Sequence, residues 1–191
     1  STVRGRAKTV GCAVASLERQ RGRASRESRV VRAPDVFFSI RYGGILAAGH
    51  VRLARHGILN LHSGALPAYR GVLASFRAVY AGEARLTATL HRIVDRGIDT
   101  GPILTSATLP FDPTRPLLGQ IIDLYGPGCQ LMAEALGALE KGDALPGTPQ
   151  DPASGAYFSK PTEEELQAFE AQGHRLCDLE DTLTYLTPFL S

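Results

Sequence analysis

The amino-acid sequence predicts an α/β protein with a mostly parallel sheet and helices on both of its faces. Short apolar or β-branched segments, typical of strands, alternate along the chain with segments that have the apolar spacing of helices. Two successive strands with a helix between them usually lie parallel, because the helix carries the chain back by a right-handed crossover. The alternation therefore favours a doubly wound arrangement.

Each segment has its own reason for assignment. Residues 17–32 are polar and basic with little periodicity, so they form either a helix or a loop, and 41–44 form a glycine-containing turn. Residues 117–141 have helical spacing, and the Gly126-Pro127-Gly128 sequence predicts a bend or two abutting helices there. A last helix begins after Thr162, where acidic residues occupy the first turn. The other predicted strands are 9–16, 36–40, 58–62, 86–94 and 103–109, and the other predicted helices are 45–56 and 72–81.

Length and composition are those of one globular domain. The chain has 191 residues, of which 43% are hydrophobic. No apolar run approaches the roughly 20 residues that span a bilayer, and no segment has the pattern of a secretory signal. The three cysteines, Cys12, Cys129 and Cys177, match neither a metal-ligand spacing nor a disulfide framework. We therefore expect a cytoplasmic protein with no metal and no membrane partner.

Basic residues are concentrated near the start of the chain. The net charge is +2, and residues 1–35 contain eight arginines and one lysine against three acidic residues. Such a segment either attracts phosphate or an acidic ligand, or forms a solvated helix surface, which we favour. No aromatic residues are interleaved with these arginines, which argues against a nucleic-acid partner.

Three polar residues are candidates for catalysis. Asn60 and His62 lie two apart in a predicted strand, so they share a face at its C-terminal end, where open α/β sheets bind ligands. Asp99, in the loop 95–101, would supply a carboxylate to the same place. An amide beside an imidazolium can stabilise a developing oxyanion. A nearby carboxylate would raise the pKa of the histidine, and it could accept a proton from an attacking amine.

Each of these residues also has a purely structural interpretation. His62 could be satisfied by backbone groups at the end of a strand, and Asn60 could form an Asx turn before Gly64. Asp99 could cap a turn before Gly101. The sequence that surrounds the three residues favours a functional site over these structural interpretations.

That surrounding sequence resembles a known family. The stretch NLHSGALPAYRG, followed by LTATLHRIVDRGIDTGPIL, is similar to the two signature stretches of the 10-formyltetrahydrofolate-dependent formyltransferases. The resemblance covers about residues 34–141 and implies a Rossmann-like formyltransferase domain. It implies that Asn60 and His62 face the formyl oxygen, and that Asp99 partners the histidine and helps proton transfer. His91 also falls where the family often has histidine, and we interpret it as structural because strand alternation turns it from the crevice.

The resemblance also implies a site for the formyl donor, 10-formyltetrahydrofolate. One turn resembles the segment that cradles the pterin ring, and one loop resembles the folate-binding loop, which uses mainly backbone groups. The turn comprises Arg41, Tyr42, Gly43, Gly44, Ile45 and Leu46, and the loop comprises Asp95, Arg96, Gly97 and Ile98.

The expected function is transfer of a formyl group to a primary amine of a small molecule, such as an amino sugar nucleotide. We expect residues 1–145 to form the formyltransferase domain, with abbreviated N-terminal units, and residues 146–191 to form a loop and helix extension packed on it. The lack of a further C-terminal domain argues against tRNA as the acceptor. The alternatives are a formyltetrahydrofolate hydrolase and a non-catalytic folate-binding protein. The oligomeric state stays open, with a homodimer as one alternative.

Overall fold

The computed structural model describes residues 34–42, 54–151 and 153–187. The chain divides into two compact units, 1–31 and 32–191, and all described residues belong to the second. The predicted strand 9–16, the basic segment 17–32 and most of the predicted helix 45–56 lie outside the described residues. Within the described ranges, no helix is both long and apolar enough to cross a membrane.

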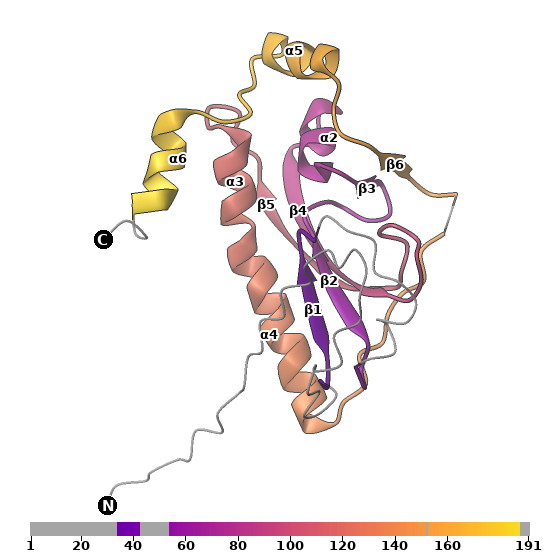
Figure 1. Cartoon of the computed structure of the whole chain (residues 1–191). Helices are drawn as coiled ribbons and strands as arrows, with labels where there is room; N and C mark the ends of the chain where they lie inside the picture. Colours follow the sequence, from indigo (N-terminus) through magenta and orange to yellow (C-terminus); the bar gives the residue numbers. More distant parts are fainter. Residues whose placement is uncertain (1–33, 43–53, 152, 188–191) are drawn as a thin grey trace, which may run out of the picture. The chain divides into compact units, whose positions relative to one another are not determined.

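The second unit is built on a four-stranded sheet with the strand order β1-β2-β4-β5 (Figure 1). The strands are β1 (Phe37–Ile40), β2 (Ile58–His62), β4 (Arg85–Ile93) and β5 (Ile103–Pro110). A smaller sheet pairs β3 (Tyr69–Gly71) with β6 (Ala156–Phe158) in parallel. Together with the helices, these sheets confirm the α/β class.

The prediction of a mostly parallel sheet is wrong for the described strands. β1 and β2 are parallel, but β2 pairs with β4 and β4 with β5 in antiparallel fashion. Only nine residues connect β4 to β5, whereas a parallel pair needs a crossover of about a dozen or more. The connection between β2 and β4, which contains α2 (Ala74–Tyr80), is 22 residues long and would also allow a parallel crossover, so its length does not set the direction of β4.

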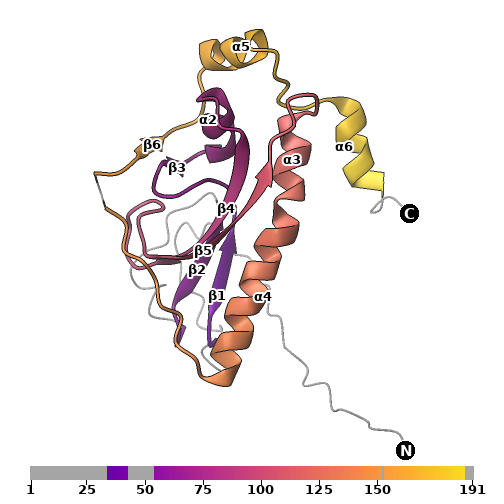
Figure 2. The ribbon, with the colours of Figure 1, turned by 180° about the vertical axis from the view of Figure 1, so that it is seen from behind.

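Two helices lie end to end along one face of the large sheet (Figures 1 and 2). They are α3 (Leu117–Asp123) and α4 (Tyr125–Lys141), which confirms two abutting helices, but they meet at Leu124, and the Gly126-Pro127-Gly128 sequence lies at the start of α4. A Cβ at Gly128 would lie 2.7 Å from Leu61 Cδ2, so glycine allows close packing of α4 against the Leu61 side chain. Leu61 lies in β2 between Asn60 and His62.

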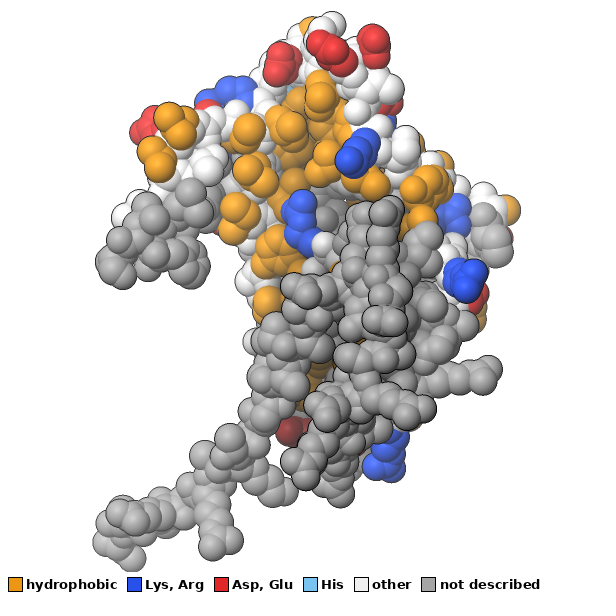
Figure 3. Space-filling view, in the orientation of Figure 1, with side chains coloured by type: hydrophobic (Ala, Val, Ile, Leu, Met, Phe, Trp, Pro, Cys, Tyr) orange, Lys and Arg blue, Asp and Glu red, His pale blue; other side chains and the backbone are white. Residues whose placement is uncertain are grey.

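The segment after residue 146 packs on the same unit. Helix α5 (Glu163–Ala171) begins at Thr162 with a capping box, as the sequence predicts, and its Phe169 is fully buried in the main core. The Phe169 and Phe76 ring centroids are 4.7 Å apart. Buried Arg77 of α2 forms an ion pair with Glu165, and acidic side chains gather over α5 in Figure 3. A final helix, α6 (Leu179–Leu186), contacts α3.

Replacement of Phe169 by alanine should lower the free energy of unfolding by about 3–5 kcal/mol, because it empties a fully buried ring site. Chemical denaturation measures this value. Leu179→Ala is the control, since the Leu179 side chain is 75% exposed and its loss should change stability little. A loss below about 1 kcal/mol for the phenylalanine variant would contradict the packing of α5 on the core.

Candidate active site

Strand β2 places Asn60 and His62 on one face. The alternate residues Leu59 and Leu61 are 0% and 2% exposed and form part of the two hydrophobic clusters. Asn60 and His62 therefore point to the opposite face, as the period of two predicts. His62 is itself buried, with 8% of its surface exposed. A buried polar pair at the end of a strand must find its partners among neighbouring side chains and backbone groups.

The loop between β4 and β5 brings Asp99 to the same place. Asp99 adopts a positive φ of 56°, a conformation that a residue other than glycine takes only where its surroundings enforce it. Gln150 provides that restraint: its side-chain Nε2 donates to the carbonyls of Asp99 at 2.9 Å and Gly101 at 2.6 Å. At Gly101 a Cβ would collide with the carbonyl of Arg92, so this turn requires glycine.

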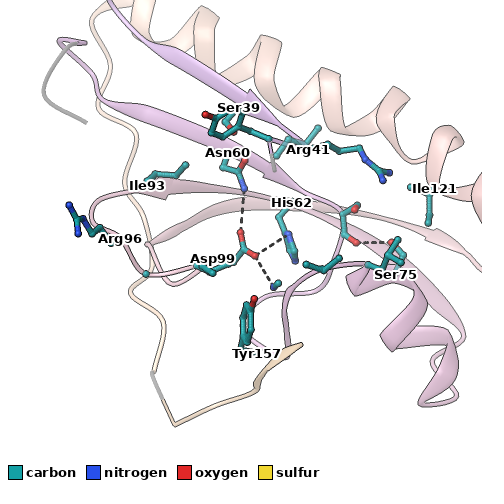
Figure 4. Close-up of a pocket in the computed structure, with 18 of the residues that line it drawn as sticks. Ser39, Arg41, Asn60, His62, Ser75, Ile93, Arg96, Asp99, Ile121 and Tyr157 are labelled. Atoms are coloured by element: carbon teal, nitrogen blue, oxygen red, sulfur yellow. Dashed lines mark hydrogen bonds and ion pairs between the residues drawn. The ribbon is translucent and has the colours of Figure 1, made fainter. Parts of the chain in front are cut away.

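The Asp99 carboxylate is the centre of the polar cluster (Figure 4). Its Oδ2 accepts the Gly71 N–H at 2.9 Å and lies 3.5 Å from His62 Nδ1. Its Oδ1 accepts a hydrogen bond from Asn60 Nδ2 at 3.4 Å. The structure thus brings together the three residues that the sequence singled out as candidates.

His91 contacts this cluster from the same face as Asn60, which strand alternation did not predict, although it is not among the residues that line the adjoining cavity. Its Nε2 lies 3.0 Å from Asn60 Nδ2 and 3.4 Å from Asp99 Oδ1. Its Nδ1–H donates to the Arg92 carbonyl at 3.0 Å, so Nε2 is the ring nitrogen that faces the Asn60 amide and the Asp99 carboxylate. In the antiparallel register Asn60 lies directly opposite His91, so the two side chains share a face. The position of His91 follows from this cross-strand register, which cannot be deduced from the sequence of one strand.

The orientation of His62 is fixed by the loop that follows β2. Its Nε2–H donates to the Tyr69 carbonyl at 2.8 Å, so in the neutral ring the Nδ1 lone pair faces Asp99. A Cβ at Gly64 would lie 2.7 Å from His62 Nε2, which explains glycine at that position. The neutral ring therefore has a free acceptor site beside a carboxylate, an arrangement that one added proton would turn into an ion pair.

Burial is the largest influence on the pKa values of both groups. Burial lowers the pKa of His62 below its ordinary value, although the charge of Asp99 and the Tyr69 carbonyl oppose the shift. Burial raises the pKa of Asp99, but His91, His62 and the Gly71 N–H together hold it below its ordinary value. The sequence predicted that the carboxylate would raise the histidine pKa. That contribution is present, but burial outweighs it, so the pair at neutral pH is a neutral imidazole beside a carboxylate.

The cluster opens into a cavity of about 470 Å³, a size typical of small-molecule sites. Asn60, His62 and Asp99 line it, and six of the predicted donor-binding residues form another part of its wall: Arg41, Tyr42, Asp95, Arg96, Gly97 and Ile98. The other four, Gly43, Gly44, Ile45 and Leu46, lie outside the described residues. Within the described ranges, no group of three or more His, Cys, Asp or Glu side chains is arranged so that it could hold a metal ion.

Two residues that the sequence did not assign to the site come from the segment after α4. Gln150 supports the backbone of Asp99, and Tyr157 of β6 lines the cavity (Figure 4). β6 is placed by its pairing with β3, and a Cβ at Gly71 would lie 2.8 Å from the Tyr157 ring. These residues occur in a Gly- and Pro-rich stretch with no periodicity, which gave no signal.

Replacement of Asp99 by asparagine should lower the pKa of His62 further, because Asp99 makes the largest of the contributions that raise it. Titration of the imidazole resonances by NMR measures this change. His174 packs between Phe111 and Phe169, away from the cluster, so the chemical shifts of its ring protons at one fixed pH report whether the substitution disturbs the fold. A rise of the His62 pKa in the variant would show that the carboxylate does not act on the ring.

Comparison with known proteins agrees with this geometry. A family model described as formyl transferase matches residues 5–117. Methionyl-tRNA formyltransferase of Synechococcus sp. strain JA-3-3Ab is 36% identical over 143 residues, which cover 72% of this chain and 44% of the relative. The crystal structure of WlaRD, a sugar 3N-formyl transferase, is 26% identical with a TM-score of 0.57, over 65% of this chain and 44% of that one.

The structure of the N-formyltransferase from Helicobacter canadensis is 29% identical with a TM-score of 0.53, over 65% of this chain and 45% of that one. The chain therefore spans less than half the length of each of these three relatives. The family model covers more than half of the chain, from before the first described strand to the start of α3. The chain belongs to the formyl transferase family.

Proposed function

We propose that this chain carries the site of a 10-formyltetrahydrofolate-dependent N-formyltransferase that acts on a primary amine of a small molecule. The observation that carries the proposal is the convergence of Asn60, His62 and Asp99 on one cavity, beside the predicted donor-binding segments. Two of the similar structures were solved with folate compounds, one with 5-N-formyl-THF and one with folinic acid.

The cavity wall fits such a donor. The loop 95–98 is held in a tight Asx turn, in which Gly97 N–H donates to Asp95 Oδ1 at 2.7 Å, and its residues line the cavity. A Cβ at Gly97 would lie 2.1 Å from Thr100 Oγ1, which excludes a larger residue there. Arg41 and Tyr42 line the cavity as well. Bound 10-formyltetrahydrofolate would supply an electrophilic formyl carbon.

The protein's own groups then provide proton transfer. When the formyl group passes from the donor nitrogen to the amine, the amine must lose a proton and the leaving nitrogen must gain one. The neutral His62 ring beside ionised Asp99 would accept the first proton and could return it to the leaving nitrogen. The resulting imidazolium would donate from Nδ1 to Asp99 Oδ2, across a gap that is 3.5 Å in the present structure. The Tyr69 carbonyl keeps the ring in the correct orientation throughout.

Asn60 faces the same cavity with its Nδ2 hydrogens directed at His91 and Asp99. The 3.4 Å contact with Asp99 is the longer of the two and the easier to give up. Protonation of the His62–Asp99 pair would weaken the hydrogen bond from Asn60 Nδ2 to Asp99 Oδ1. Asn60 could then donate to a negatively charged oxygen of the substrate, which is the role that an oxyanion stabiliser requires.

The identity of the amine that accepts the formyl group is a separate part of the proposal. The Helicobacter canadensis structure is a complex with dTDP-3-aminofucose, which favours an amino sugar nucleotide. The identity with methionyl-tRNA formyltransferases favours charged tRNA as a second candidate. Formyl transfer assays with each acceptor in turn distinguish the two. Formate release without any amine would instead identify a hydrolase, and folate binding without turnover would identify a binding protein.

Replacement of Asp99 by asparagine should lower kcat by about 10²- to 10⁴-fold, because the proton-accepting pair is lost. The affinity for 5-formyltetrahydrofolate should stay within about twofold, since the neutral amide occupies the same volume. Steady-state assays and calorimetric titration measure the two effects. Asp143→Asn removes an exposed carboxylate elsewhere and is the control. Near-normal turnover in the Asp99 variant would refute the assignment of the site.

Replacement of Gln150 by alanine should lower kcat by about 10- to 100-fold with a smaller change in KM. The variant leaves the Asp99 and Gly101 carbonyls unpaired and releases the backbone that orients the carboxylate. The pH profile of kcat should shift as well, because the Asp99–His62 geometry relaxes. Gln130→Ala, at an exposed helix position, is the matched control. A loss of activity that only parallels a loss of folded protein would contradict this positioning role.

A further inference from the structure

A second cavity adjoins the first on the side of the C-terminal segment. It has a volume of about 290 Å³ and is lined by Arg70, Ile98, Thr100 and Tyr157. Ile98 and Tyr157 line both cavities, so a ligand in the first can extend past them into the second. The proposed catalytic residues and the segment matched to the pterin turn lie outside its lining.

Arg70 is a cation without an acidic partner among the described residues. Its Nη2 donates to the Gly155 carbonyl at 3.2 Å, and its buried Nε has no hydrogen-bond partner there. The other partly or fully buried arginines are engaged more fully. Arg77 is paired with Glu165, and Arg92 donates to the carbonyls of His56 and Leu145. A guanidinium has five N–H donors, so Arg70 retains donors at the wall of the cavity.

The position of Arg70 is set by the small sheet. Arg70 and Tyr157 are register partners in the β3–β6 pair, so their side chains emerge side by side. The Tyr157 side chain is 53% exposed, which leaves an aromatic face open beside the guanidinium. Thr100 adds a hydroxyl group to the same wall. A cation, a hydroxyl and an aromatic face at one concave place match a ligand that ends in an anionic group.

We infer that Arg70, Thr100 and Tyr157 form a subsite that binds carboxylate or phosphate oxygens of a substrate seated in the reaction cavity. The planar guanidinium suits both groups because each offers two oxygens to a fork of N–H donors. The inference rests on the proposed function for the identity of the substrate. The anion is either a carboxylate on the glutamate tail of the folate donor or the diphosphate of a nucleotide-linked acceptor.

The test is a comparison of matched ligands on the whole chain and on Arg70→Gln. Calorimetry measures the dissociation constants of 5-formyltetrahydrofolate, its neutral dimethyl ester, dTDP and inorganic diphosphate. The variant should weaken the binding of one of the anionic ligands by about tenfold or more, because a charge-assisted hydrogen bond is lost. The binding of the ester should stay unchanged. Arg85→Gln removes the same charge from an exposed site at the start of β4 and is the control.

The outcomes separate the sources of the anion. Weaker binding of the folate but not of its ester identifies the glutamate tail, and weaker binding of dTDP or diphosphate identifies the acceptor. Equal binding of every anionic ligand by the two proteins, at an unchanged melting temperature, overturns the inference, as does the absence of measurable binding of any of them to the parent chain. Diphosphate bound through Arg70 without any formyl transfer would retain the subsite and reject the proposed function.

Discussion

The buried carboxylate of Asp99 is the group on which the arrangement of the site depends. A charge removed from water is tolerated only where hydrogen-bond donors and other polar partners surround it. Its partners here come from three separate parts of the chain: Asn60 and His62 of β2, Gly71 of β3 and His91 of β4. Each of these elements has to take its place before the carboxylate is satisfied. The requirement couples the polar cluster to the antiparallel pairing of the central strands.

The segment that follows α4 is part of the site as well as a cover for the core. Thr148 forms a two-way backbone bridge with Ile103, Gln150 holds the Asp99 loop, and Tyr157 lines the cavity. Farther along, Phe169 and the Arg77–Glu165 pair fasten α5 to α2. The anchoring of α5 therefore stabilises the stretch of chain that carries β6. A change that loosens α5 would reach the cavity through the β3–β6 pair.

Local sequence patterns predicted some of these structural features correctly and did not predict others. The period of two along β2 correctly paired Asn60 with His62, and the capping pattern at Thr162 correctly began α5. Asp99 could be connected to them only through the resemblance to a family, because a loop residue has no periodicity. The antiparallel pairing of β4 with β5 followed from a short connection that was visible in the sequence but was given too little weight, whereas the 22-residue connection between β2 and β4 left the direction of β4 open. The place of His91 depended on a cross-strand register, which no single strand contains.

The protonation of His62 shows why residue types alone do not determine a catalytic role. A carboxylate beside an imidazole usually raises the pKa of the ring, and on that basis the sequence indicated an imidazolium. In the folded chain the ring lies beneath a loop that excludes water, and burial dominates. A neutral ring is the more useful state for a reaction in which an amine must lose a proton. In the proposed reaction, the neutral His62 ring beside Asp99 would serve as the proton acceptor, and the two would form an ion pair only after the proton arrives.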